Sequence, residues 1–168
     1  MSINLEPVES VRQRYRPERI LTLFVGESAP HSGKFFYLGN TTLKRHMQEA
    51  VEAAGLGANN NFLERFKGLG WYLDDLVLTP VNHLTKAERK AACVNARKSL
   101  AERIEKYQPE AIVPLLYSIK DVVQGAAKDA GSTAPCYPVP FAGMGHQNPF
   151  LEEMGRILPK LPRTTGLS

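Results

Sequence analysis

Cysteine is scarce in this sequence, which contains only two in 168 residues. These are Cys93 and Cys136, which lie far apart in the chain and in unlike surroundings. A disulfide framework and a metal site built from several cysteines are therefore excluded. None of the four histidines stands at metal-ligand spacing. We expect no metal, no cofactor and a reducing, cytoplasmic environment.

Long apolar runs are also missing, since none approaches the roughly 18–20 residues of a membrane span. The first residues, MSINLEPVESVRQRYRPE, lack the apolar centre of a secretory signal and predict a polar lead-in or a short helix. Net charge is only +4, with a pI of about 9.1. Such an excess tolerates a polyanionic partner without requiring one, because scattered surface lysines produce it too.

The residues that are present suit one globular domain over positions 1–168, and we expect a monomer. Four segments rich in β-branched and aromatic residues are predicted strands: 19–25, 71–78, 110–116 and 136–140. Helical periodicity predicts helices at 42–54, 62–67, 85–107, 118–130 and 148–158, with caps at Asn61, at Thr85 (a capping box with Glu88) and at Ser118. This alternation predicts an α/β fold, in which three α/β/α layers surround a central four-stranded parallel sheet, with its core at about 19–158.

Ligands of parallel sheets collect outside the carboxyl ends of the strands. In this chain those ends read GESAP, TPVNH, YS and FAGMGHQN. Three of the four are rich in glycine, proline and hydrogen-bonding side chains. The sequence therefore predicts a binding site at this edge of the sheet.

The first of these ends lies in LFVGESAPHSGKFFY, residues 23–37, which superficially resembles a phosphate-binding loop. Such a loop has four residues between its first glycine and the Gly-Lys pair, whereas six separate Gly26 from Gly33 here. Phe35 stands where the magnesium-binding hydroxyl belongs, and Pro30 lacks an N–H donor. The G-x-G-x-x-G fingerprint of dinucleotide sites is absent as well. The stretch therefore does not predict a nucleotide phosphate site.

The same stretch suits a flat, uncharged ring. Gly26 has no side chain, so a ligand can approach the backbone closely. One of the aromatic residues at 35–37 can lie face-on against the ring. Glu27 and Ser28 supply polar groups at the same edge. The alternative interpretation, in which the aromatic residues belong to the core and Glu27 is a capping carboxylate, stays open.

Four segments, in this order, resemble the uracil-DNA glycosylase superfamily, nearest its G-E-x-P-G branch. VGESAP is similar to the first motif of that branch, and GKFFYLGNTTL to the G-x-P-F segment that follows it. WYLDDLVLTPVN and QPEAIVPLLYSIKDVV resemble two of its later strand segments. The resemblance covers residues 19–158 and implies that fold, DNA as partner, and excision of uracil or another damaged or modified base. That branch holds an iron–sulfur cluster on four cysteines, so no cluster is expected here.

The resemblance also implies roles for individual residues. Phe36 takes the position of the ring that stacks on uracil, and Asp75 that of the base-reading asparagine. The family histidine after the last strand is replaced by Phe141, and His146 follows five residues later. The candidate catalytic residues are Glu27, Asp75 and His146. The candidate base-binding residues are Gly26, Ser28, Ala29, Pro30, Phe36, Asn82, Gly143 and Gln147, and the candidate DNA phosphate contacts are Lys34 and His31.

Asp75 departs from the family pattern in a chemically informative way. A carboxylate only accepts hydrogen bonds, so it suits a cytosine-like edge better than uracil. A second interpretation is a protonated Asp75 in a dry pocket. In a third, Asp74 or Asp75 pairs with an arginine or lysine and never meets substrate. Because adjacent strand residues point to opposite faces, at least one of the two acids faces burial or a site.

Three hypotheses of function follow from these residues. The first is a glycosylase that excises a flipped base from single- or double-stranded DNA. The second is a nucleic-acid-binding module of the same fold without catalysis, favoured by Phe141 at the histidine position. The third is a hydrolase of a free nucleoside or nucleotide, favoured by the modest net charge.

Overall fold

The computed structural model describes residues 8–28, 33–57, 61–143, 145 and 147–164. Its sheet has three parallel strands, β1 (Thr22–Ser28), β2 (Trp71–Val77) and β3 (Ala111–Pro114), in the order β2-β1-β3. The strands are buried almost throughout, as expected for a parallel sheet covered by helices. The predicted α/β class is confirmed.

The fourth predicted strand, 136–140, does not form, so the sheet has three strands and the four-stranded prediction is wrong. This segment runs beside β3 with one isolated parallel bridge, between Cys136 and Ile112. The Val139 N–H donates to the Pro114 carbonyl at 3.0 Å. A regular ladder cannot continue, because Pro114 on β3 has no N–H to donate to the segment opposite.

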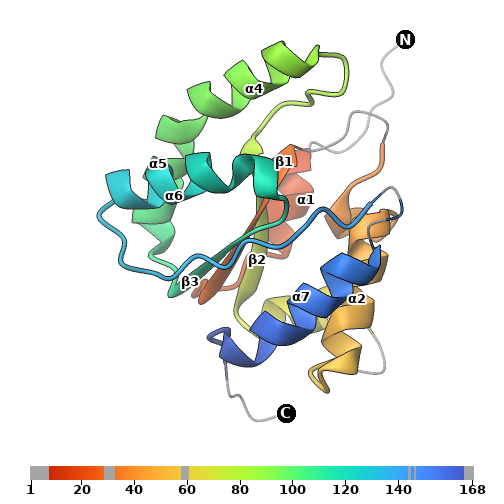
Figure 1. The fold of residues 1–168 in the computed structure, drawn as a ribbon. Helices are drawn as coiled ribbons and strands as arrows, with labels where there is room; N and C mark the ends of the chain where they lie inside the picture. Colours follow the sequence, from red (N-terminus) through yellow and green to blue (C-terminus); the bar gives the residue numbers. More distant parts are fainter. Residues whose placement is uncertain (1–7, 29–32, 58–60, 144, 146, 165–168) are drawn as a thin grey trace.

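Helices lie on either side of the sheet, with α4, α5 and α6 on one side and α2 and α7 on the other (Figure 1). The α-helices are α1 (Val8–Arg14), α2 (Thr42–Ala53), α3 (Phe62–Gly68), α4 (Lys86–Asn95), α5 (Arg97–Tyr107), α6 (Lys120–Asp129) and α7 (Gln147–Ile157). The described residues also form three short 3-10 helices, η1 (Phe36–Leu38), η2 (Tyr117–Ile119) and η3 (Leu158–Lys160). None of the helices in the described ranges is long and apolar enough to cross a bilayer.

Two of the predicted helix caps are confirmed. The Asn61 side chain accepts the Glu64 N–H, and Thr85 forms the predicted reciprocal box with Glu88. The predicted cap at Ser118 is wrong, because η2 precedes α6 and no side chain caps it.

The predicted helix 85–107 is two helices that meet at Ala96. The break lets α4 carry Arg89 to the Glu27 carboxylate at the end of β1, while α5 packs along α6.

β1 begins and ends three residues later than predicted. It continues through Gly26, because β2 supplies a paired partner beyond that point: Gly26 lies opposite Asp75, and Ser28 opposite Val77. Gly26 to Ser28 are therefore held in the sheet rather than in a loop. This places their side-chain positions at the carboxyl edge with a fixed geometry.

Candidate functional site

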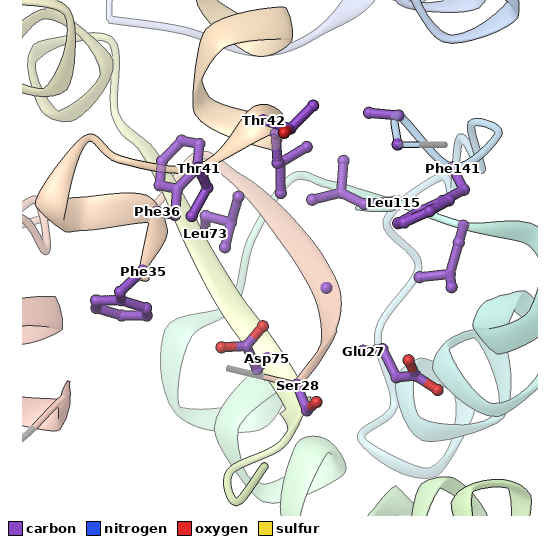
Figure 2. A pocket seen from close by; sticks show the side chains of 15 residues that line it. Glu27, Ser28, Phe35, Phe36, Thr41, Thr42, Leu73, Asp75, Leu115 and Phe141 are labelled. Carbon is purple, nitrogen blue, oxygen red and sulfur yellow. The ribbon is translucent and has the colours of Figure 1, made fainter. Parts of the chain in front are cut away.

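A pocket of about 310 Å³ opens at the carboxyl edge of the sheet, where the sequence predicts ligand binding. It is formed by the ends of all three strands, by the start of α2 and by the segment that precedes α7. Figure 2 shows Asp75, Ser28 and Glu27 along one end of the pocket, with Phe36 and Phe141 on opposite sides of it. Its lining is mostly apolar, and the residues are Gly26, Glu27, Ser28, Phe35, Phe36, Thr41, Thr42, Leu43, Leu73, Asp75, Leu115, Leu116, Phe141, Ala142 and Gly143.

The two aromatic walls differ in how they are held. Phe36 is 3% exposed and packs edge-on against Tyr37 and Phe66, at 5.0 and 5.5 Å between ring centroids. Phe36 therefore belongs to the core and also lines the pocket. The sequence leaves these two interpretations of the aromatic run as alternatives. Phe141 is 47% exposed and lies against Gly143, where a Cβ atom would come within 2.9 Å of the ring.

Gly26 makes room for Asp75 rather than for a ligand. The two residues are paired across β1 and β2, so their side-chain positions share one face of the sheet. A Cβ atom at position 26 would come within 2.8 Å of Asp75 Oδ1, well inside van der Waals contact. The absent side chain thus lets the carboxylate lie across the end of β1 at the base of the pocket.

Asp75 is also one member of a buried network of two acids and two arginines. Arg12 Nη2 donates to Asp75 Oδ2 at 2.7 Å, and Arg12 Nη1 lies 3.4 Å from Asp74 Oδ1. Arg103 donates to Asp74 Oδ2 at 2.9 Å. Arg12, Asp74 and Asp75 are each at most 4% exposed. Both acids are therefore paired, in agreement with the third interpretation of this acidic pair, and Asp75 lines the pocket as well.

Burial raises the pKa of Asp75 to about 6, while Arg12 opposes the increase and Asp74 adds to it. The carboxylate form still predominates at neutral pH. Oδ1 accepts no hydrogen bond from the described residues, whereas Oδ2 is held by Arg12. One oxygen of Asp75 is therefore available to a ligand as an acceptor.

Glu27 lies at the same end of the pocket but is turned toward α4. Its Oε1 accepts a hydrogen bond from Arg89, and its Oε2 lies 3.9 Å from Cys93 Sγ. Burial raises the pKa of the Cys93 thiol, and the Glu27 carboxylate raises it further. The thiol is therefore protonated at neutral pH and is no nucleophile. Glu27 is a paired anion at the rim, with a side chain 19% exposed.

The pocket gathers six of the thirteen residues predicted for the site: Gly26, Glu27, Ser28, Phe36, Asp75 and Gly143. Asn82 and Lys34 are exposed and are not among the described residues that line it. Ala29, Pro30, His31 and His146 lie outside the described residues. Gln147 is the first residue of α7, and its side chain is likewise outside the description.

Arg12, Thr41 and Leu115 are site residues that the sequence did not suggest. Arg12 lies 63 positions before Asp75 in a segment predicted as a polar lead-in or a short helix. The sequence does indicate that a buried cation is needed, because adjacent acids on a buried strand require buried cations nearby. No group of three or more potential metal-ligating side chains occurs in the part of the chain that the structure describes.

The chain matches no known protein-family model, and no curated protein matches it significantly. Function is therefore inferred from the pocket and from the motifs that form it.

Proposed function

We propose that this protein is a member of the uracil-DNA glycosylase superfamily that binds a flipped base of DNA in this pocket and hydrolyses its N-glycosidic bond. The observation that carries the proposal is a carboxylate with one unbonded oxygen at the base of a pocket with a phenylalanine on each side. The three-layer arrangement of that family, a monomeric state and a cytoplasmic location belong to the same proposal.

The size and lining of the pocket support a single base as ligand. Small-molecule sites range from about 300 to 1,000 Å³, so about 310 Å³ suits one ring system rather than a large cofactor. A base can reach such a site only after it leaves the DNA stack, which costs the stacking energy with its neighbours. Stacking against aromatic side chains of the protein offsets part of this cost. Phe36 and Phe141 are the rings placed to do this.

The polar end of the pocket favours a base edge that carries an N–H donor. Asp75 Oδ1 accepts, and the Ser28 hydroxyl accepts or donates. An exocyclic amino group satisfies this arrangement, whereas a carbonyl oxygen facing an ionised Asp75 would be repelled. Uracil or another oxo-base fits the same position when Asp75 is protonated, which its raised pKa permits at mildly acidic pH.

Hydrolysis needs a proton acceptor for the attacking water. The water oxygen bonds to C1′ of the sugar, the N-glycosidic bond breaks, and its electron pair leaves with the base. Asp75 Oδ1 is occupied by the base edge, so the Glu27 carboxylate at the same end of the pocket takes the proton from the water. Glu27 adds negative charge near the positively charged sugar of the transition state.

The test is base release from oligonucleotides that carry uracil, hypoxanthine, xanthine or an amino-pyrimidine lesion, in single- and double-stranded form. We expect free base from at least one substrate, and a loss of about 10²- to 10⁴-fold in rate for Glu27→Gln. Glu105→Gln on α5, remote from the pocket, is the matched control. The absence of free base across the whole panel would refute the enzymatic part of the proposal.

One observation favours binding without hydrolysis. Phe141 stands where the family has its histidine, and it presents an exposed ring to the pocket wall instead of a hydrogen-bond donor. A non-catalytic module would bind DNA with a strong salt dependence and release no base. Binding measured at several salt concentrations, beside the base-release assay, separates the two functions.

A further inference from the structure

Arg12 reaches the pocket from α1, a helix that precedes the region of family resemblance. Its guanidinium is 1% exposed and, besides its 3.4 Å approach to Asp74, makes three contacts. Nη2 donates to Asp75 Oδ2 at 2.7 Å, Nη1 donates to Glu9 at 2.6 Å, and the group lies 5.2 Å from the centre of the Phe35 ring. Both Asp75 and Phe35 line the pocket, so one buried cation contacts two of its walls.

The contact with Arg12 makes the two oxygens of Asp75 different. Oδ2 is engaged by the guanidinium, and Oδ1 lies beside the Cα of Gly26. A partial rotation of the carboxylate would break the bond to Arg12, and a half-turn only exchanges two equivalent oxygens, so one oxygen stays bonded and the other stays free. The guanidinium therefore determines which oxygen a ligand meets.

The residue that follows α1, Tyr15, makes a second, independent contact that holds this helix against the pocket. The ring of Tyr15 stacks on Tyr37 at 5.3 Å with an interplanar angle of 9°, and the Tyr37 hydroxyl accepts the Leu73 N–H at 2.6 Å. Tyr37 follows Phe36, and Leu73 lines the pocket. Hence α1, η1 and β2 form one packed unit around the site, and Arg12 is not an incidental surface residue.

We propose that Arg12 is the positioning residue of this pocket: it holds Asp75 so that Oδ1 faces the cavity as a hydrogen-bond acceptor, and the pocket therefore selects rings that present an N–H at that place. The part of this inference that concerns the ligand rests on the proposed base pocket. The part that concerns Asp75 rests on the contacts of Arg12 alone.

The charges around Asp75 determine what loss of Arg12 does. Arg12 comes from α1, where it also contacts Glu9, and Arg103 approaches from α5. Asp74 precedes Asp75 on β2, and the Tyr37 hydroxyl lies nearby on η1. Without Arg12, two buried carboxylates share Arg103. Asp75 then holds its proton to higher pH, and its free oxygen becomes a donor that favours a carbonyl.

The experiment combines Arg12→Met with two companion variants, Arg12→Lys and Gln13→Met. Gln13 is the matched control, since it is the next residue of α1, is exposed and bonds only to Glu9 among the described side chains. The Asp75 carboxyl carbon is followed by NMR as a function of pH. Affinities for 1-methylcytosine and 1-methyluracil are measured by calorimetry at about pH 8, where ordinary carboxyl groups are ionised.

We expect wild type, Gln13→Met and Arg12→Lys to prefer 1-methylcytosine by about tenfold, the effect of one polar contact. In Arg12→Met Asp75 should titrate at least about two pH units higher, so that it is half protonated or more at about pH 8, and the preference should disappear or reverse. An Asp75 titration unchanged in Arg12→Met would overturn the positioning role. Wild-type protein that prefers 1-methyluracil would overturn the ligand part while leaving the base pocket intact, and binding of neither compound would overturn the base pocket itself.

The wild-type protein supplies a second test that does not depend on the folding of Arg12→Met. Asp75 takes up a proton near pH 6, so the preference for 1-methylcytosine should be absent at about pH 5. Unbound 1-methylcytosine is still mostly neutral at that pH. A preference that is equal at about pH 5 and at about pH 8 contradicts the inference.

Discussion

Stability should fall as Asp75 ionises, and this can be isolated by comparing wild type with Asp75→Asn. Burial raises the pKa of this carboxyl from its ordinary 3.8 to about 6. The folded protein therefore holds the proton more tightly than the unfolded chain does. The contribution of the protonated Asp75 to the free energy of unfolding is complete below about pH 4 and is lost as the pH rises through about 6.

The magnitude follows from the size of the pKa shift. A displacement from 3.8 to about 6, at about 1.4 kcal/mol for each pH unit, corresponds to about 3 kcal/mol. Asparagine does not titrate, so the free energy of unfolding of wild type relative to Asp75→Asn should decrease by about this amount between about pH 4 and pH 7.

The assay is urea unfolding of both proteins at a series of pH values, analysed as the difference between them. Asp121→Asn, at an exposed position on α6, is the matched control. The difference in its free energy of unfolding from wild type should not show the decrease expected for Asp75. If the difference between wild type and Asp75→Asn stays constant over this pH range, the raised pKa and the burial that explains it are refuted.

Three further predictions concern single residues. Gly26→Ala should destabilise the protein by about 1–3 kcal/mol in urea unfolding, because its Cβ would clash with Asp75 Oδ1. If the clash is the cause, the same substitution must destabilise the Asp75→Ala protein less. Phe141→Ala should change stability by less than about 1 kcal/mol, because the ring is exposed, yet it should weaken binding of methylated bases in calorimetry. Thr85→Ala should cost about 1 kcal/mol through loss of the capping box on α4, seen as a lower urea midpoint, and unchanged stability would contradict that role.

Local signals in the sequence were sufficient for much of the fold. Asn61 and Thr85 begin their helices as predicted, because a cap depends on residues three positions away. The binding edge could also be located, since it follows from parallel strand order alone. Gly26, Ser28 and Asp75 lie together in the pocket for that reason, and Phe36 joins them from η1.

The remaining features depend on partners distant in the chain. Gly26 is a plausible strand end, but β1 continues past it because Asp75 on β2 pairs with it. The segment 136–140 has strand-like residues, yet Pro114 on β3 lacks the N–H that would continue the ladder. The adjacent acids on β2 indicate a buried cation, but no local pattern identifies it as Arg12, which lies 63 positions from Asp75.

The central claim is that a base occupies the pocket between Phe36 and Phe141, above Asp75. The most direct measurement is an amide NMR titration of the protein with a short single-stranded oligonucleotide that carries one modified base. We expect saturable shifts at Gly26, Ser28, Leu73 and Leu115 that are absent with the same oligonucleotide lacking only that base. Shifts confined to other surfaces, or equal shifts with and without the base, would contradict the claim.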